Sequence, residues 1–115
     1  RKILGKRNLP ITSTCVRVPV ENSHSVSVNL EFEKEFDLTE LKEAFKNKKG
    51  IVLQDDVKNN IYPMAINASG FDEVFVGRIR RDFSVENGVN LWIVADNIRK
   101  GAATNTVQIA ELLIK

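Results

Sequence analysis

A strict alternation of apolar and polar residues over positions 26–33 constrains the fold of this chain most strongly. The apolar positions are Val26, Val28, Leu30 and Phe32, and serine, asparagine and glutamate lie between them. Because successive side chains of a strand point to opposite faces of a sheet, this pattern predicts a strand with one buried and one wet face. The wet face would then meet either solvent or a partner subunit.

Four other segments have the composition of strands. The first is rich in β-branched residues and should end near Pro19, which cannot donate to a ladder. The last two flank Asn87-Gly88, a strong hairpin signal, so we expect them to pair antiparallel. In the earlier of these two, Arg78 and Arg80 should share a wet face with carboxylate partners, opposite Phe75, Gly77 and Ile79. The segments are residues 11–20, 51–53, 73–82 and 91–95.

Two helices complete the predicted order of elements. Asp37 followed by Glu40 is typical of a helix start, and Gly50 is typical of a helix end. A second helix is expected over about residues 97–115, where apolar residues recur at helical spacing. Mostly antiparallel strands combined with helices predict an α+β fold, in which a mixed sheet carries its helices on one face.

Composition excludes several classes of protein. The chain has 115 residues, of which 43% are hydrophobic and 28% charged, and these values are those of one globular domain or a piece of a larger one. A net charge of +2 is too small to imply nucleic-acid binding by itself, and no apolar run is long enough to predict a membrane span. One Cys and one His exclude a disulfide scaffold and a structural zinc site. The chain starts at Arg1, so we expect a processed start or a fragment.

Arg17 and His24 are the first candidates for chemistry. If the chain reverses around Val20 and Glu21, Arg17 at the end of one strand lies opposite His24 at the start of the next. The guanidinium is a planar fork for a carboxylate, and imidazole titrates near neutral pH, so the pair would form an anion site with an acid/base group beside it. Taken alone, an arginine and a histidine in a chain of this size more often have structural roles, and both interpretations stay open.

Three other features are not expected to carry chemistry. Cys15 is expected to be a small buried side chain in a strand, without the helix N-terminus that would activate a thiolate. Asp55 and Asp56 are adjacent, so on an extended segment they point in opposite directions and favour a turn over a metal site. The glycines never follow the G-x-G-x-x-G spacing of a dinucleotide-binding loop.

Several stretches make the chain similar to a known family. They are Thr-Cys-Val-Arg-Val-Pro-Val at 14–20 with His24-Ser25, Asp-Glu-Val-Phe-Val-Gly-Arg-Ile-Arg-Arg-Asp at 72–82, Asn-Leu-Trp at 90–92, Ala-Asp-Asn at 95–97, and residues 1–4 and 99–112. Together they resemble the C-terminal domain of bacterial aspartate-semialdehyde dehydrogenases. The resemblance covers essentially the whole chain, and the Arg-to-His spacing makes it specific.

The resemblance implies a fold like the C-terminal domain of glyceraldehyde-3-phosphate dehydrogenase-like proteins. It also implies a cytoplasmic enzyme that uses NADPH to reduce aspartyl phosphate to aspartate semialdehyde, on the route to lysine, methionine, threonine and diaminopimelate. The family's cysteine nucleophile lies in an upstream Asn-Pro motif that is missing here, so Cys15 is not that nucleophile. We therefore expect residues 1–115 to be a partial chain without the N-terminal dinucleotide-binding domain, and inactive alone.

The resemblance also assigns roles to three residues. Arg17 would grip the α-carboxylate of the small-molecule substrate, His24 would be the general acid/base, and Asn97 would contact the nicotinamide carboxamide of NADP. No metal, nucleic acid or membrane is implied. The expected partner is another copy, in a homodimer or homotetramer joined through the exposed sheet face. The final helix, from about residue 97 to 115, would pack against the dinucleotide-binding domain.

Two alternatives remain open from the sequence. One is a related acyl-phosphate or acyl-thioester reductase with a different substrate, although the Arg-to-His spacing disfavours it. The other is a dimerisation module that keeps the fold and catalyses nothing. Only the catalytic interpretations predict a large loss of activity when Arg17 is changed in the complete protein.

Overall fold

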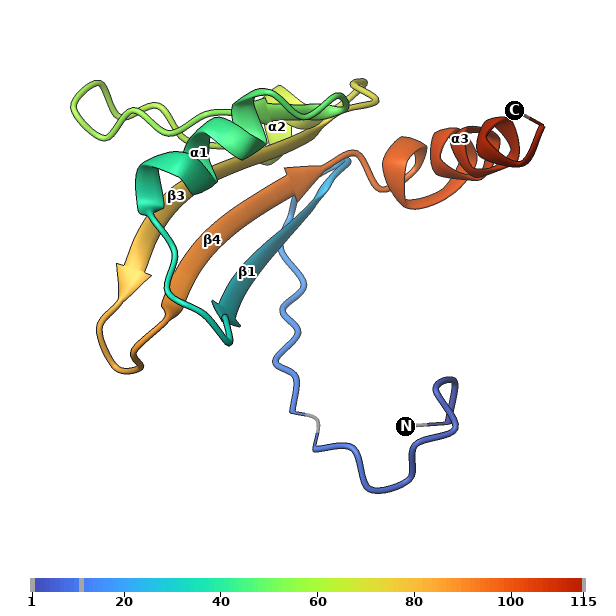
Figure 1. The fold of residues 1–115 in the computed structure, drawn as a ribbon. Helices are drawn as coiled ribbons and strands as arrows, with labels where there is room; N and C mark the ends of the chain where they lie inside the picture. The colour runs from blue at the N-terminus through green and yellow to red at the C-terminus, as the bar shows by residue number, and fades with distance from the viewer. Residues whose placement is uncertain (1, 11, 115) are drawn as a thin grey trace.

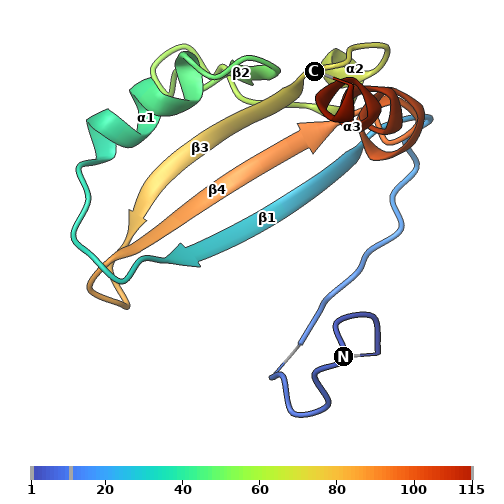
Figure 2. The same cartoon turned by 45° about the vertical axis from the view of Figure 1, so that its right-hand side comes forward.

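A four-stranded mixed sheet is the centre of the computed structural model, which describes residues 2–10 and 12–114. The strand order is β1-β4-β3-β2. The pairs β1·β4 and β3·β4 are antiparallel, and β2·β3 is parallel. Figure 2 shows β1, β4 and β3 side by side along their length, and the arrangement confirms the predicted α+β class. The strands are β1 (His24–Glu31), β2 (Ile51–Leu53), β3 (Val74–Asp82) and β4 (Gly88–Ala95).

The first helix starts where its sequence predicts. The helix α1 (Leu38–Lys46) begins after Asp37, whose Oδ1 accepts the backbone N–H groups of Thr39 at 2.7 Å and Glu40 at 2.9 Å. These bonds satisfy amides that have no partner within the helix, and they favour the ionised carboxylate. The Glu40 amide, and after it the Thr39 amide, holds the pKa of Asp37 below its usual value.

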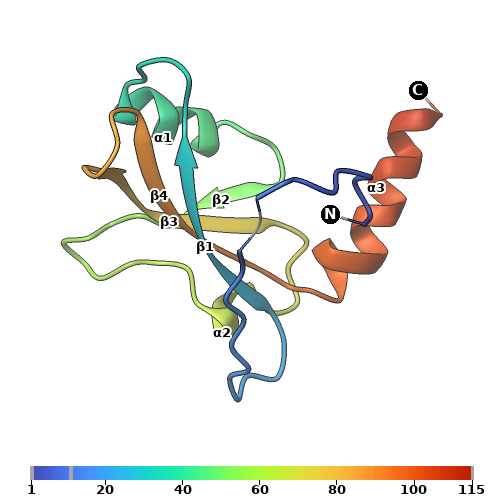
Figure 3. The same cartoon turned by 90° about the horizontal axis from the view of Figure 1, so that it is seen from below.

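The predicted final helix consists of two parts. A π-helical turn, η1 (Arg99–Ala103), leads into α3 (Thr104–Leu113). Asp72 ties the start of this unit to the sheet, because its Oδ1 accepts from Arg99 Nη1 at 2.9 Å and from Thr104 Oγ1 at 2.8 Å. Beyond that anchor α3 stands apart from the sheet (Figures 1 and 3), and its apolar side chains are exposed. No helix within the described residues is long and apolar enough to cross a membrane.

The core lies on both faces of the sheet. The helix α1 packs through Leu38, Leu41 and Phe45 onto a cluster on one face. On the opposite face, the short helix α2 (Ala65–Ala68) covers only one end, and its Ala68 packs against Phe75 and Val94. The rest of that face is not covered by a helix, and we call it the open face. The cluster beneath α1 consists of Val76, Ile79, Val89 and Leu91.

An extra residue in β3 changes which side chains share a face. Gly77 pairs with Trp92 but Arg80 pairs with Asn90, so two residues of β3 lie opposite one residue of β4. Arg78, with φ of 54°, is the bulged residue. The prediction that Phe75 and Gly77 lie opposite the two arginines was therefore wrong, because Arg78 and Arg80 both line the open face, on which Phe75 also lies. Ile79 does lie on the opposite face, in the cluster beneath α1.

An ion pair between a half-buried lysine and a buried aspartate lies next to this bulge. Asp55 Oδ2 lies 2.7 Å from Lys42 Nζ, and the Asp55 side chain is only 3% exposed. Its other oxygen, Oδ1, accepts from the backbone N–H of Ile79 at 3.3 Å, directly after the bulged residue. The interpretation of Asp55 as a plain turn residue therefore missed its structural role.

Gly77 sits where no side chain fits. An ideal Cβ at this position would lie 2.0 Å from the backbone oxygen of Gln54 and 2.6 Å from Pro63 Cδ. We expect Gly77→Ala to lower the free energy of unfolding by about 1–3 kcal/mol, because the backbone of the bulge must shift. Gly101→Ala is the matched control, since its Cβ would approach no atom closer than 3.8 Å. Denaturant titration of both variants measures the difference, and an unchanged midpoint for Gly77→Ala would contradict the prediction.

The strand predicted over residues 11–20 was wrong. Residues 12–22 form no strand, and position 11 lies outside the described residues. The backbone N–H of Val20 donates to the oxygen of Val18 at 2.9 Å, closing a tight turn around Pro19. A β-branched composition favours an extended chain, but a strand also needs a neighbour, and this segment runs away from the sheet (Figure 1).

Candidate functional site

The antiparallel pairing of β1 with β4 brings His24 and Asn97 to the same end of the sheet. His24, the first residue of β1, pairs with Ala95, the last residue of β4, and Asn97 follows two positions later. The two segments are joined directly, because the backbone N–H of Ser23 donates to Asn97 Oδ1 at 2.8 Å. The His24 side chain is exposed, and it has no hydrogen bond or ion pair to another described residue.

The described residues before Ser23, 2–10 and 12–22, contain no strand and no helix, and we call them the lead segment. Ser23, between the lead segment and β1, is buried although it is polar. It is 5% exposed, and its φ of 78° lies in the left-handed region that non-glycine residues rarely adopt. Its hydroxyl donates to the backbone oxygen of Ala65 at 3.1 Å. The preceding Asn22 donates from Nδ2 to Ser69 Oγ at 3.2 Å. The chain therefore enters β1 through a turn fixed at Ser23, preceded by bends at Pro19, Glu21 and Asn22.

Asp96 anchors the other side of this junction. Its carboxylate is 4% exposed and accepts three backbone N–H groups: Gly70 at 2.8 Å, Ile98 at 2.9 Å and Arg99 at 3.2 Å. The Gly70 bond contributes most to holding the pKa of Asp96 below its usual value, against the opposing effect of burial. The carboxylate thus stays ionised and fixes the exit of β4, on which Asn97 sits.

No hydrogen bond, ion pair or strand pairing joins Arg17 to His24 among the described residues. Arg17 lies in the exposed segment before β1, and no ion pair or hydrogen bond links its side chain to the part of the chain that the structure describes. The hairpin that would have placed Arg17 opposite His24 requires a strand at 11–20, which does not form. Cys15 is exposed in the same segment, so its predicted burial was wrong for the same reason.

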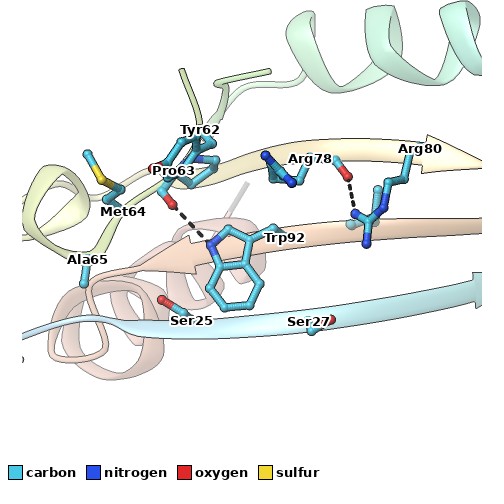
Figure 4. A pocket seen from close by; sticks show the side chains of 10 residues that line it. Ser25, Ser27, Tyr62, Pro63, Met64, Ala65, Arg78, Arg80 and Trp92 are labelled. Carbon is cyan, nitrogen blue, oxygen red and sulfur yellow. Dashed lines mark hydrogen bonds between the residues drawn. The ribbon is translucent and has the colours of Figure 1, made fainter. Parts of the chain in front are cut away.

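A groove on the open face is a second candidate for binding. It has a volume of about 480 Å³ and lies between β1, β3, β4 and the loop before α2 (Figure 4). The Arg78 guanidinium lies 5.8 Å from the centre of the Tyr62 ring, and Arg80 Nη1 donates to the oxygen of Arg78 at 2.8 Å. Trp92 Nε1 donates to the oxygen of Pro63 at 3.2 Å. The groove is lined by Ser25, Ser27, Tyr62, Pro63, Met64, Ala65, Arg78, Arg80, Leu91 and Trp92.

The carboxylate partners predicted for Arg78 and Arg80 do not form ion pairs with them, although the charge of Arg80 acts at longer range on Asp82, whose pKa is lowered mainly by hydrogen bonds from Ser84 and Asn29. Neither guanidinium forms an ion pair with a carboxylate of the described residues. Both remain available to an anionic group from outside this chain. No three His, Cys, Asp or Glu side chains gather into a possible metal site among residues 2–10 and 12–114.

Sequence reasoning missed Ser23 and Asp96, which build the junction between β1 and β4. Ser23 gives no local signal, because its left-handed conformation depends on partners far along the chain. Asp96 could have been found, since an aspartate directly before a helical segment is a preferred capping residue. The aromatic wall of the groove depends on packing of the 62–65 loop against β4, which no pattern in the sequence specifies.

Comparison with known proteins gives a consistent assignment. Residues 1–100 match the model of the "Semialdehyde dehydrogenase, dimerisation domain" family. The chain is 56% identical over 115 residues to an aspartate-semialdehyde dehydrogenase of Aquifex aeolicus, covering 100% of this chain and 34% of that protein. It is 46% identical over 116 residues to the enzyme of the same name from Bacillus subtilis, again covering 100% of this chain and 34% of the relative.

A solved structure agrees with the sequence relatives. The crystal structure of aspartate semialdehyde dehydrogenase II from Vibrio cholerae, complexed with ASA, superposes with a TM-score of 0.80 at 46% identity. The match covers 88% of this chain and 30% of that one. The chain therefore spans about a third of the length of the relatives that it matches. On its match to the family model over most of its length, the chain belongs to the semialdehyde dehydrogenase dimerisation-domain family.

Proposed function

We propose that the chain is the substrate-binding and dimerisation part of an aspartate-semialdehyde dehydrogenase. The complete enzyme would convert aspartyl phosphate to aspartate semialdehyde and phosphate with NADPH, in the cytoplasmic biosynthesis of lysine, methionine, threonine and diaminopimelate. The observation that carries the proposal is the meeting of His24 and Asn97 at one end of the β1·β4 pair, in a chain that is 56% identical to a relative of that name.

In this proposal His24 is the general acid/base. Its imidazole is exposed and has no described partner, so it is free to accept a proton from a thiol and return it to a reaction intermediate. The nucleophilic thiol would come from a part of the enzyme outside these residues, because Cys15 lies in the lead segment, away from any helix N-terminus that would stabilise a thiolate. Arg17 would bind the substrate α-carboxylate through its planar fork.

Asn97 is the residue that suits NADP, whose reduced form, NADPH, would supply the hydride. Its Oδ1 is occupied by the Ser23 N–H, so its amide N–H groups remain for a carbonyl acceptor such as the nicotinamide carboxamide. The chain has no glycine-rich dinucleotide loop, so a separate dinucleotide-binding domain would hold the rest of the cofactor. In that arrangement residues 1–115 form one partial unit, and the segment from about 97 to 115 closes against that domain through the exposed apolar side chains of α3.

The activity assay is the direct test. We expect the complete protein to oxidise aspartate semialdehyde with NADP and phosphate, and the 115-residue chain alone to show neither turnover nor measurable NADP affinity. The reason is that this chain would supply only Asn97 to the cofactor, and that the nucleophilic thiol would lie in another part of the enzyme. Measured turnover by the chain alone would overturn the proposed division of labour. A complete protein that dimerises without turnover would favour the non-catalytic dimerisation module.

We also expect the protein to form a homodimer, or a homotetramer built from dimers, through the open face. That face presents Arg78 and Arg80 without carboxylate partners beside exposed polar and aromatic groups, and it continues along β1. A second copy would cover it and could supply carboxylates to the two arginines. Light scattering at micromolar concentration measures the mass, and Arg80→Glu should shift it toward the monomer. A monomeric wild-type protein would contradict this expectation.

A further inference from the structure

One hydrogen bond links the candidate ligand contact after β4 to the residue before His24. The backbone N–H of Ser23 donates to Asn97 Oδ1 across 74 positions of sequence, at 2.8 Å. Because a backbone N–H is always a donor, the Asn97 atom that meets it must be the oxygen. This bond fixes the orientation of the Asn97 amide, so its NH₂ group points away from Ser23. No described residue accepts a hydrogen bond from that NH₂ group.

The conformation that this bond holds is an uncommon one. Ser23 has φ of 78° and is 5% exposed, so its backbone is both unfavourable for a non-glycine residue and shielded from water. A buried N–H without a partner is costly, which makes the Asn97 oxygen a strong constraint on this conformation. A second hydrogen bond, from the Ser23 hydroxyl to the backbone oxygen of Ala65, also holds the residue in place.

The constraint reaches His24 because it is the next residue. The φ and ψ of Ser23 set the direction in which the chain enters β1, and His24 pairs with Ala95 immediately afterwards. Asn97 is itself held in place by its neighbour Asp96, whose carboxylate accepts from Gly70, Ile98 and Arg99. A continuous set of hydrogen bonds therefore runs from the exit of β4 through Asn97 and Ser23 to the backbone of His24, from which the imidazole projects.

We propose that Asn97 is a positioning residue for His24 as well as a ligand contact. Its oxygen holds Ser23 and so places the imidazole, while its NH₂ group faces the carbonyl acceptor of the ligand. This inference rests on the proposed function, because it assigns His24 the acid/base role. Its consequence is that the ligand contact and the proton-transfer group keep one fixed separation.

Two substitutions at position 97 of the complete enzyme separate the two tasks. Asn97→Asp keeps an oxygen acceptor for Ser23, whereas Asn97→Ala removes it, and both remove the amide donors. We expect both variants to raise KM for NADP. Only Asn97→Ala should lower kcat, by about 10- to 100-fold, because a displaced imidazole transfers protons poorly. The kcat values are compared on the plateau of each pH profile, so that the new charge in Asn97→Asp does not affect the comparison.

A second variant covers the case in which Asn97→Ala does not fold. Asn97→Leu keeps a side chain of about the same size as that of Asn97→Asp but offers no acceptor to the Ser23 N–H. We expect its kcat to lie about 10- to 100-fold below that of Asn97→Asp, with KM for NADP raised in both variants. Equal kcat in Asn97→Asp and in the variant without an acceptor, Asn97→Ala or Asn97→Leu, would overturn the proposal.

A readout independent of activity separates this inference from the proposed function. Hydrogen exchange of the complete protein, followed in the peptide that contains the Ser23 amide, should be faster in Asn97→Ala than in the wild type and Asn97→Asp. If the wild-type protein lacks dehydrogenase turnover, the proposed function fails and the exchange result alone decides the link. Unchanged exchange in Asn97→Ala would show that Asn97 does not hold Ser23, and would overturn the inference.

Discussion

Replacing His24 with alanine in the complete enzyme is expected to lower kcat by about 10²–10⁴-fold, because it removes proton transfer and not substrate binding. The position of His24 supports a role in proton transfer and not in substrate binding. The residue opens β1 at the end of the sheet where Asn97 lies, and its exposed imidazole has no described partner to compete for the proton. Steady-state kinetics should therefore show a large fall in kcat with little change in KM for the substrate.

Two controls sharpen the His24 experiment. Added imidazole should restore part of the lost kcat in His24→Ala, since the variant leaves a space next to the reacting groups. Ser25→Ala, the adjacent residue of β1, should stay close to the wild-type kcat, because its hydroxyl has no described partner and no proposed role in proton transfer. A His24→Ala variant that raises KM alone would instead make His24 a binding residue.

Local sequence signals predicted those elements whose cause is local. The alternation over 26–33 indicated β1, which runs from His24 to Glu31, but the buried face that it predicted was wrong, because Val28 alone is half-buried in this edge strand. Asn87-Gly88 lies where the turn after β3 leads into β4. The N-cap at Asp37 was predicted because a short polar side chain finds the free amides of its own helix. In each case the interacting groups are a few residues apart, so composition and spacing suffice.

Features that depend on distant partners escaped prediction. The segment 12–22 has strand composition but no neighbouring strand, so its backbone does not pair. The bulge at Arg78 depends on Asp55 and Lys42, which lie on other elements and meet the strand only after folding. An arginine at positive φ carries no signal of its own, because the conformation is imposed by the surrounding structure.

The candidate site shows the same division. The pairing of His24 with Ala95 follows from the register of β1 with β4, which the sequence does not specify. The roles of His24 and Asn97 came from resemblance to a family, and the structure then placed both residues at one end of the sheet. Neither the sequence pattern nor the family resemblance predicts the hydrogen bond from Ser23 to Asn97, since it joins a backbone group to a side chain 74 positions away.

Arg17→Lys should lower kcat/KM of the complete enzyme by on the order of 30- to 150-fold, mostly through a higher KM. The guanidinium forms two parallel charge-assisted bonds with a carboxylate, whereas the lysine ammonium keeps the charge and loses the fork. Because the α-carboxylate is bound in both the ground state and the transition state, the loss should appear in KM more than in kcat.

The surroundings of Arg17 decide how that loss can be interpreted. Its side chain is exposed and has no hydrogen bond or ion pair to a described residue, so Arg17→Lys removes no structural contact of this chain. Arg7→Lys, an equally exposed change in the same lead segment, is the matched control and should leave KM unchanged. The opposite pattern, with KM unchanged in Arg17→Lys while His24→Ala raises only KM, would mean that the carboxylate-binding and proton-transfer roles are exchanged. An Arg17→Lys variant with wild-type kinetics would remove Arg17 from the site and leave the substrate carboxylate to another cation.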